Sequence, residues 1–232
     1  MLKIERTVLP SPEQWEIMIE GMRNPKNSWD KMDSHLCYGC GTEQCGYMER
    51  CDKGDCFDIG ENDHKLMMGL AKGGAVHAKY RRMIPVFLTI NAPLYWWKEF
   101  DAYKVGTVAN SCSTMHKIHA KEFTLDDFSH EHLIEPEDDA IVSKELLRMI
   151  IGHLNYWRSE YLETKDKDCW WQLIQLLPSS YNQKRTVMLN YEVLAKMYVE
   201  RKNHKLDEWH VFCDWIKSLP YPELIIGEDD NE

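Results

Sequence analysis

The sequence lacks any run of about 18 or more apolar residues, which is what a membrane-spanning helix requires. Its first residues, Met1 to Arg6, carry charges where a secretory signal peptide would be apolar. We therefore expect a cytoplasmic protein that has no membrane partner.

Positive charge is also scarce, because 28 Lys and Arg residues stand against 38 Asp and Glu, for a formal net charge of -10. Binding to nucleic-acid phosphates needs a cationic face, so we expect no nucleic-acid partner. Hydrophobic residues make up 44% of the 232 residues, which is enough for a sizeable core and excludes disorder as the main state. The length predicts a single domain over residues 1–232.

Short catalytic motifs are missing as well. The sequence has no glycine-rich phosphate loop, no Gly-x-Ser-x-Gly nucleophile elbow and no His-Glu-x-x-His metal motif. It also has no internal repeats. Any function must therefore be carried by less regular groups of residues.

Cysteine, in contrast, is abundant in one short stretch. Cys37 and Cys40 have the spacing of a zinc-binding turn, and Cys45 and Cys51 follow at short intervals. In a cytoplasmic protein such a cluster indicates metal ligands or free thiols before disulfides. We expect residues 33–60 to form a cysteine-rich insert in which these four thiolates coordinate Zn²⁺. His35 and Cys56 are alternative ligands, and a set of reduced thiols or an iron–sulfur cluster is an alternative state.

The hydrophobic pattern predicts an α+β fold, helix-rich, with a modest antiparallel or mixed sheet. A β-rich run over residues 84–90 begins beside Pro85, which would confine it to an edge or to the start of a strand. Residues 105–113 have the composition of a loop, and the acidic residues 227–232 that of a disordered tail. The predicted helices cover residues 12–24, 65–72, 94–103, 143–161, 180–201 and 207–218.

Within the polar loop, small hydroxyl, amide and thiol side chains follow a basic residue. Backbone amides and hydroxyls of this kind can hold a phosphate, and Lys104 could neutralise it. A solvated turn with no ligand is the alternative. Arg201 lies at the end of a predicted helix, where a cation is favoured in any protein.

These segments resemble the flavin-dependent thymidylate synthases. That family has a Gly-His pair, a strand to Ala-Pro, and the signature Arg-His-Arg-x-x-Ser-x-Asn-Glu-x-Ser-x-Arg. Here His77 precedes Ala92-Pro93, and residues 102–114 align with the signature without a gap. Leu177-Pro178, Asn190 and Arg201 match the family's C-terminal pattern. The resemblance covers about residues 77–218 and is weak over the first third.

The signature itself is heavily changed. Its first Arg, its His and its second Arg are replaced by Ala102, Tyr103 and Lys104. The family's Arg two residues after the C-terminal Asn is Glu192 here. Further along the signature, Thr107 replaces Ser, Ala109 replaces Asn, Asn110 replaces Glu, Cys112 replaces Ser and Thr114 replaces Arg.

The resemblance implies a homotetramer that carries out reductive methylation of dUMP to dTMP with FAD, NADPH and methylene-tetrahydrofolate. In that scheme His77 and Asn190 contact the flavin, and Arg201 is catalytic because it stabilises charge on the base. The loop residues Lys104, Thr107, Asn110 and Cys112 bind the substrate. Because Lys and Thr replace bidentate arginines poorly, a nucleotide-binding homologue without turnover is an alternative, as is a flavoenzyme for another pyrimidine nucleotide.

Overall fold

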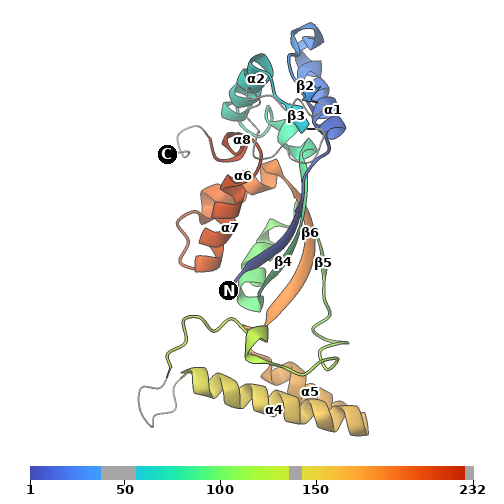
Figure 1. Ribbon diagram of the computed structural model, residues 1–232, viewed down its shortest axis with the longest axis vertical. Coiled ribbons are helices and arrows are strands. Elements are labelled where there is room, and N and C mark those ends of the chain that lie inside the picture. The colour runs from blue at the N-terminus through green and yellow to red at the C-terminus, as the bar shows by residue number, and fades with distance from the viewer. Residues whose placement is uncertain (38–55, 136–142, 228–232) are drawn as a thin grey trace.

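A four-stranded antiparallel sheet in the order β1-β4-β6-β5 forms the centre of the computed structural model (Figure 1). The structure describes residues 1–37, 56–135 and 143–227. The strands are β1 (Lys3–Val8), β4 (Pro85–Pro93), β5 (Val108–Ser111) and β6 (Asn182–Asn190), and a separate hairpin pairs β2 (His35–Cys37) with β3 (Cys56–Asp58). This architecture confirms the predicted helix-rich α+β fold with an antiparallel sheet.

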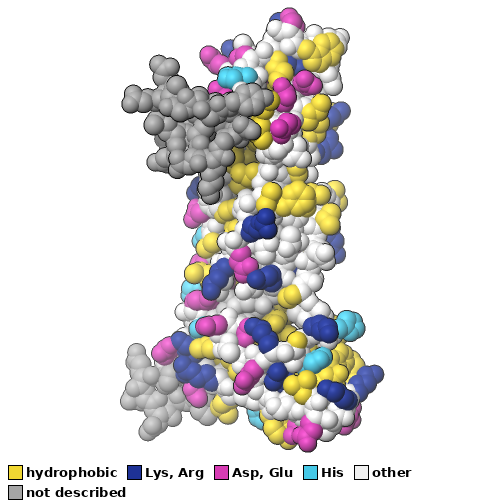
Figure 2. Space-filling view, turned by 45° about the vertical axis from the view of Figure 1, so that its right-hand side comes forward, with side chains coloured by type: hydrophobic (Ala, Val, Ile, Leu, Met, Phe, Trp, Pro, Cys, Tyr) yellow, Lys and Arg dark blue, Asp and Glu magenta, His cyan; other side chains and the backbone are white. Residues whose placement is uncertain are grey.

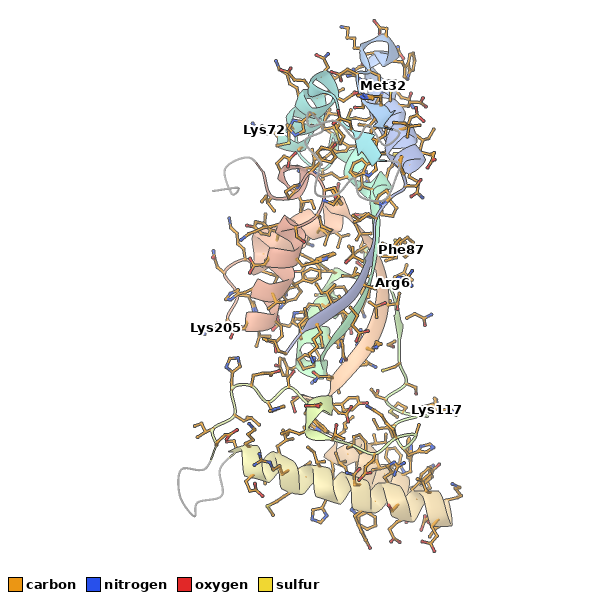
Figure 3. The ribbon with its side chains drawn as sticks, viewed as in Figure 1. Arg6, Met32, Lys72, Phe87, Lys117 and Lys205 are labelled. Carbon is orange, nitrogen blue, oxygen red and sulfur yellow. The ribbon has the colours of Figure 1, made fainter. Side chains whose placement is uncertain are left out.

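One face of the sheet is covered by helices and carries the main core. The side chains of β4 alternate, so that Val86, Leu88 and Ile90 are buried, whereas Phe87 between them is 47% exposed. Figure 3 shows Phe87 pointing away from the helical layer. In Figure 2 hydrophobic side chains reach the surface among Lys and Arg side chains. Any ligand cavity enclosed by the fold is therefore expected on the helical side.

The helices agree with most of the predicted ranges. The first, α1, begins with a capping box in which the Gln14 backbone N–H donates to Ser11 Oγ at 3.3 Å and Gln14 Oε1 accepts from the Ser11 N–H at 2.8 Å. The helices are α1 (Pro12–Arg23), α2 (Glu61–Lys72), α3 (Leu94–Phe100), α4 (Ser143–Thr164), α5 (Lys167–Leu176), α6 (Tyr191–Arg201), α7 (Asp207–Lys217) and α8 (Glu223–Ile226). Two short 3₁₀ turns, η3 (Lys79–Met83) and η4 (Asp101–Tyr103), matter for the site.

The predicted helix over residues 180–201 is wrong in its first half. Residues 182–190 form β6, which pairs with β4 from Pro85 opposite Asn190 to Pro93 opposite Asn182. Alternation buries Gln183, Val187 and Leu189 on one face of β6, and this period-two pattern suits a strand. Asn190 then caps α6, so the helical pattern begins only at Tyr191.

Two further strands differ from the expectation. Residues 108–111, predicted as a loop, pair with β6 as β5. All four are exposed, so no apolar alternation marked them. The strand β1 was not predicted at all, although it pairs with β4. As a consequence β4 lies inside the sheet, and Pro85 is accommodated at its first position.

A second hydrophobic cluster lies apart from the main core, between α4, α5 and the segment that precedes them. Its members are Ile118, Phe123, Phe128, Leu147, Ile151, Leu154 and Leu173. The ring of His119 packs against Tyr161 at 4.9 Å between centroids. Burial, together with the charges of Lys117, Lys165 and Arg158, lowers the pKa of His119.

A buried ion pair joins α1 to α2 at the base of the predicted cysteine-rich insert. Arg23 Nε donates to Asp63 Oδ1 at 2.5 Å, and both side chains are almost fully buried. Asp63 Oδ2 accepts from the Ser34 backbone N–H at 2.9 Å, from Ser34 Oγ at 2.7 Å and from the Asp33 N–H at 3.0 Å. Because removal of either charge would leave the other buried and unpaired, this network is expected to be important for stability.

Among the described residues, no helix is both long and apolar enough to cross a bilayer. Of the predicted zinc ligands, Cys37 ends β2, whereas Cys40, Cys45 and Cys51 lie outside the described residues. The predicted tail lies outside them too, apart from Gly227. The zinc-binding insert and the disordered tail therefore stay predictions.

Candidate functional site

A cavity of about 490 Å³ opens on the helical side of the molecule. Its lining comes from three stretches that are distant in sequence, within residues 71–82, 102–106 and 190–196. The volume falls in the range of cofactor and small-molecule sites. Each stretch contains a segment that sequence analysis had selected: the neighbourhood of His77, the signature loop and Asn190.

The first stretch is the chain reversal after α2, and small residues dominate it. Gly74 has a φ of 86°, and its carbonyl accepts from the backbone N–H groups of His77 at 2.9 Å and Ala78 at 3.0 Å. Only small side chains of this stretch face the cavity up to η3, from Ala71, Gly74, Ala75 and Ala78. A flat ligand ring could therefore approach the backbone closely here.

The second and third stretches meet at Gly106. This residue has a φ of 83°, and a Cβ placed on it would lie 2.9 Å from Val193 Cγ2 and 3.5 Å from Asn190 Nδ2. Asn190 Oδ1 accepts from the Val193 backbone N–H at 3.1 Å and so caps α6. The amide Nδ2 is therefore the group of Asn190 that is turned toward the loop.

Several polar atoms at the cavity are buried without a hydrogen-bond partner among the described residues. Arg81 Nε and Glu192 Oε2 belong to side chains that line the cavity. Thr107 Oγ1 belongs to the residue directly after Gly106, which lines it. Arg82 and Lys196 also line it, so three cations face one carboxylate. Unsatisfied buried polar groups are costly, and a bound ligand or water can satisfy them. The arrangement suits an anionic ligand that also carries hydrogen-bond donors.

Arg201, the predicted catalytic residue, lies next to this cavity but does not line it. Its Nη1 donates to Glu99 Oε2 at 3.0 Å and its Nε donates to the Tyr103 hydroxyl at 2.8 Å. The guanidinium also sits 4.9 Å from the ring centre of Trp209. His204 Nε2 contacts the same Glu99 oxygen at 3.1 Å. The positive charge of Arg201 is thus largely matched by Glu99.

Tyr103 connects the cavity with Arg201, because its side chain lines the cavity and its hydroxyl contacts the guanidinium. The hydroxyl donates in turn to Glu200 Oε2 at 2.7 Å. Burial raises the pKa of Tyr103 to about 12, and the hydrogen bond to Glu200 acts in the same direction. Tyr103 therefore remains a neutral hydrogen-bonding group at physiological pH.

The remaining predicted side chains lie at the surface around the cavity or farther away. His77 is exposed on the turn against Gly73, and Lys104 is exposed beside the cavity loop. Asn110 lies on β5, and Cys112 is an exposed free thiol whose backbone N–H donates to the Lys184 carbonyl at 2.9 Å. Of the predicted site residues only Asn190 is therefore among the described residues that line the cavity, together with Ala102, Tyr103, Val105 and Gly106 of the signature segment. The described lining does not include His77, Lys104, Thr107, Asn110 or Cys112.

Metal binding finds no support within the described part of the chain, where no group of three His, Cys, Asp or Glu residues is placed to hold an ion. Arg81, Arg82, Lys196 and Glu192 were not predicted as ligand-binding residues, although all four line the cavity. The first two belong to a basic run shortly after His77, which was the available signal.

Comparisons with known proteins place this site in a known fold. No family model matches the chain, and no curated protein matches it. Two crystal structures of the flavin-dependent thymidylate synthase ThyX from Helicobacter pylori, both with FAD and dUMP, superpose with TM-scores of 0.62 and 0.59. In both matches the identity is 13%, and the alignment covers 100% of this chain and 99% of the other. The chain therefore has the fold of the flavin-dependent thymidylate synthases, which confirms the resemblance at that level.

Proposed function

We propose that this protein is a flavin-dependent enzyme that converts dUMP to dTMP by reductive methylation. The observation that carries the proposal is that Asn190, the first half of the signature segment and the turn that holds His77 all border one cavity of about 490 Å³. Convergence of this kind is required for a nucleotide site but is not required for the fold to be stable.

The residues around the cavity fit a flavin dinucleotide. Small residues of the turn after α2 would let a planar ring lie against the backbone, and Asn190 Nδ2 would donate to a ring carbonyl. Arg81, Arg82 and Lys196 would hold the phosphates. FAD would supply hydride transfer when bound, with NADPH and methylene-tetrahydrofolate as co-substrates. Arg81 Nε has no hydrogen-bond partner within the described ranges, and a phosphate oxygen would satisfy it, which supports this fit.

At the pyrimidine nucleotide, some side chains would hold the substrate in position and Arg201 would stabilise charge on the base. Lys104 would hold the phosphate of dUMP together with the Thr107 hydroxyl, which has no hydrogen-bond partner in the described part of the chain. Arg201 would stabilise negative charge that develops on the base, but only when substrate competes with Glu99 for the guanidinium. Tyr103 would keep that guanidinium at the edge of the cavity.

Two measurements on the purified full-length protein test the proposal. FAD binding is followed by quenching of flavin fluorescence, and turnover is followed by tritium release from 5-tritiated dUMP with FAD, NADPH and methylene-tetrahydrofolate. We expect saturable FAD binding and dUMP-dependent tritium release. Absence of both would overturn the proposal. We also propose the homotetramer implied by the resemblance, and a monomer in light scattering would count against it.

A second function, nucleotide binding without turnover, is favoured by one specific observation. Glu99 holds Arg201 in a hydrogen-bonded ion pair, and the signature arginines of the family are replaced by Ala102 and Lys104. A protein of this kind would bind FAD or dUMP but release no tritium with any reductant. The two measurements above therefore separate the two functions.

A further inference from the structure

The carboxylate of Glu192 stands out among the groups that line the cavity. It lies in the first turn of α6, where the helix dipole favours an acid, and this is its ordinary explanation. An acidic side chain in the first turn of a helix is normally solvated, however. Here Oε2 is shielded from solvent and has no hydrogen-bond partner among the described residues. The cost of such an atom is removed if a ligand donates to it.

The other groups of the cavity define what that ligand must carry. Arg81, Arg82 and Lys196 can only donate, and Asn190 has its oxygen committed to the cap of α6. Among the described charged side chains of the lining, Glu192 alone is an acceptor. A ligand that satisfies this set has an anionic part facing the cations and hydroxyl or N–H donors facing Glu192.

We propose that Glu192 is the specificity-determining residue of the cavity and selects a phosphorylated polyol through its hydroxyl groups. A carboxylate accepts well from neighbouring hydroxyls of a ribityl or ribosyl chain, and it repels a phosphate placed beside it. The phosphate is thereby directed to Arg81, Arg82 and Lys196. This inference rests on the proposed function and deepens it, since it assigns the orientation and the chemical class of the ligand.

Three flavins that differ in one feature at a time test the inference by fluorescence titration. Lumiflavin has the ring alone, riboflavin adds the hydroxyl chain, and FMN adds the phosphate. In Glu192→Gln we expect the affinity for riboflavin to fall about tenfold, because a charge-assisted hydrogen bond is lost, while that for lumiflavin is unchanged. In Glu192→Arg we expect the affinity ratio of FMN to riboflavin to rise about tenfold. The control is Glu163→Gln, an exposed acid on α4, which contributes no described residue to the cavity lining, and it should change none of the three.

The possible outcomes separate the inference from the proposed function. If the wild type binds flavins but Glu192→Gln weakens lumiflavin as much as riboflavin, Glu192 only supports the shape of the cavity and the inference is wrong. It is also wrong if Glu192→Arg leaves the ratio of FMN to riboflavin unchanged. If the wild type binds FAD but none of the three flavins, the inference is wrong and the flavin-dependent function stands. If it binds neither these flavins nor FAD, both fail.

Discussion

Replacing Gly106 by alanine tests the geometry that joins the loop to α6. The backbone of this residue is left-handed, with a φ of 83°, which costs a residue with a Cβ about 1–2 kcal/mol. The new Cβ would also lie 2.9 Å from Val193 Cγ2, well inside the roughly 3.5–4.0 Å of a favourable carbon contact. Overpacking of this kind adds about 1–3 kcal/mol. We expect Gly106→Ala to lower the free energy of unfolding by about 2–5 kcal/mol.

Urea denaturation measures this loss, and a second substitution separates its two parts. Val193→Ala removes the methyl that the new Cβ would meet, but it leaves the backbone strain. The double variant should therefore lose less stability than the sum of the two single variants, by about 1 kcal/mol or more. Gly152→Ala on α4 is the control, because beyond the helix's own backbone and the two neighbouring residues no described atom lies within 4 Å of a Cβ there. It should gain up to about 1 kcal/mol.

Gly106→Ala also tests whether the loop shapes the cavity. If the loop must yield to accept the Cβ, the lining formed by Val105 and Gly106 shifts, and FAD affinity should fall in Gly106→Ala but not in Gly152→Ala. The reasoning is refuted if Gly106→Ala is as stable as the wild type. It is refuted as well if the losses of Gly106→Ala and Val193→Ala are strictly additive, since the two residues would then not be in contact.

Three other predictions follow from contacts described above. Asp63→Ala should reduce the free energy of unfolding by about 3–5 kcal/mol in urea denaturation, because it leaves Arg23 buried and uncompensated; a loss below about 1 kcal/mol would show that the pair is not buried in solution. The pKa of His119 is lower in the folded state than its ordinary value near 6.5, so its contribution to stability is present above about pH 6.5 and is lost as the pH falls below it. The unfolding free energy of His119→Gln should therefore depend less on pH between about 5 and 7 than that of the wild type, and an identical pH dependence would contradict this. Arg201→Ala should abolish any tritium release from dUMP, whereas Cys112→Ser, which restores the residue of the resembled family, should preserve it; the reverse result would assign the chemistry to the thiol.

Local signals predicted the elements whose own residues carry the information. The capping box at Ser11, the long amphipathic pattern of α4 and the β-branched run after Pro85 each determine structure through near neighbours. The strand β5 was missed because its four exposed residues owe their conformation to pairing with β6. The helical pattern assigned to residues 182–190 was wrong for a related reason: β4 pairs along the whole of β6, and tertiary pairing overrides a weak local period.

The residues of the candidate site also differ in whether the sequence could predict them. Asn190 and the signature loop could be predicted because their spacing resembles that of a known family. Glu192 could not, since nothing local distinguishes it from a surface charge, and for Arg81 the basic run after His77 was the only local signal. Both residues are recognised as site residues only because they line one cavity. The ion pair of Arg201 with Glu99 could not be predicted from the sequence either, because it joins the end of α6 to α3 across 102 positions of the chain.

Blocking the cavity with a large side chain tests whether FAD binds there. Ala75 is exposed and lines the cavity, so Ala75→Trp should fill part of it without disturbing the buried core. Ala120→Trp places the same side chain on an exposed position that does not line the cavity. In a fluorescence titration with FAD, we expect wild-type affinity for Ala120→Trp and a loss of at least about tenfold for Ala75→Trp. FAD binding by Ala75→Trp with wild-type affinity would contradict this expectation.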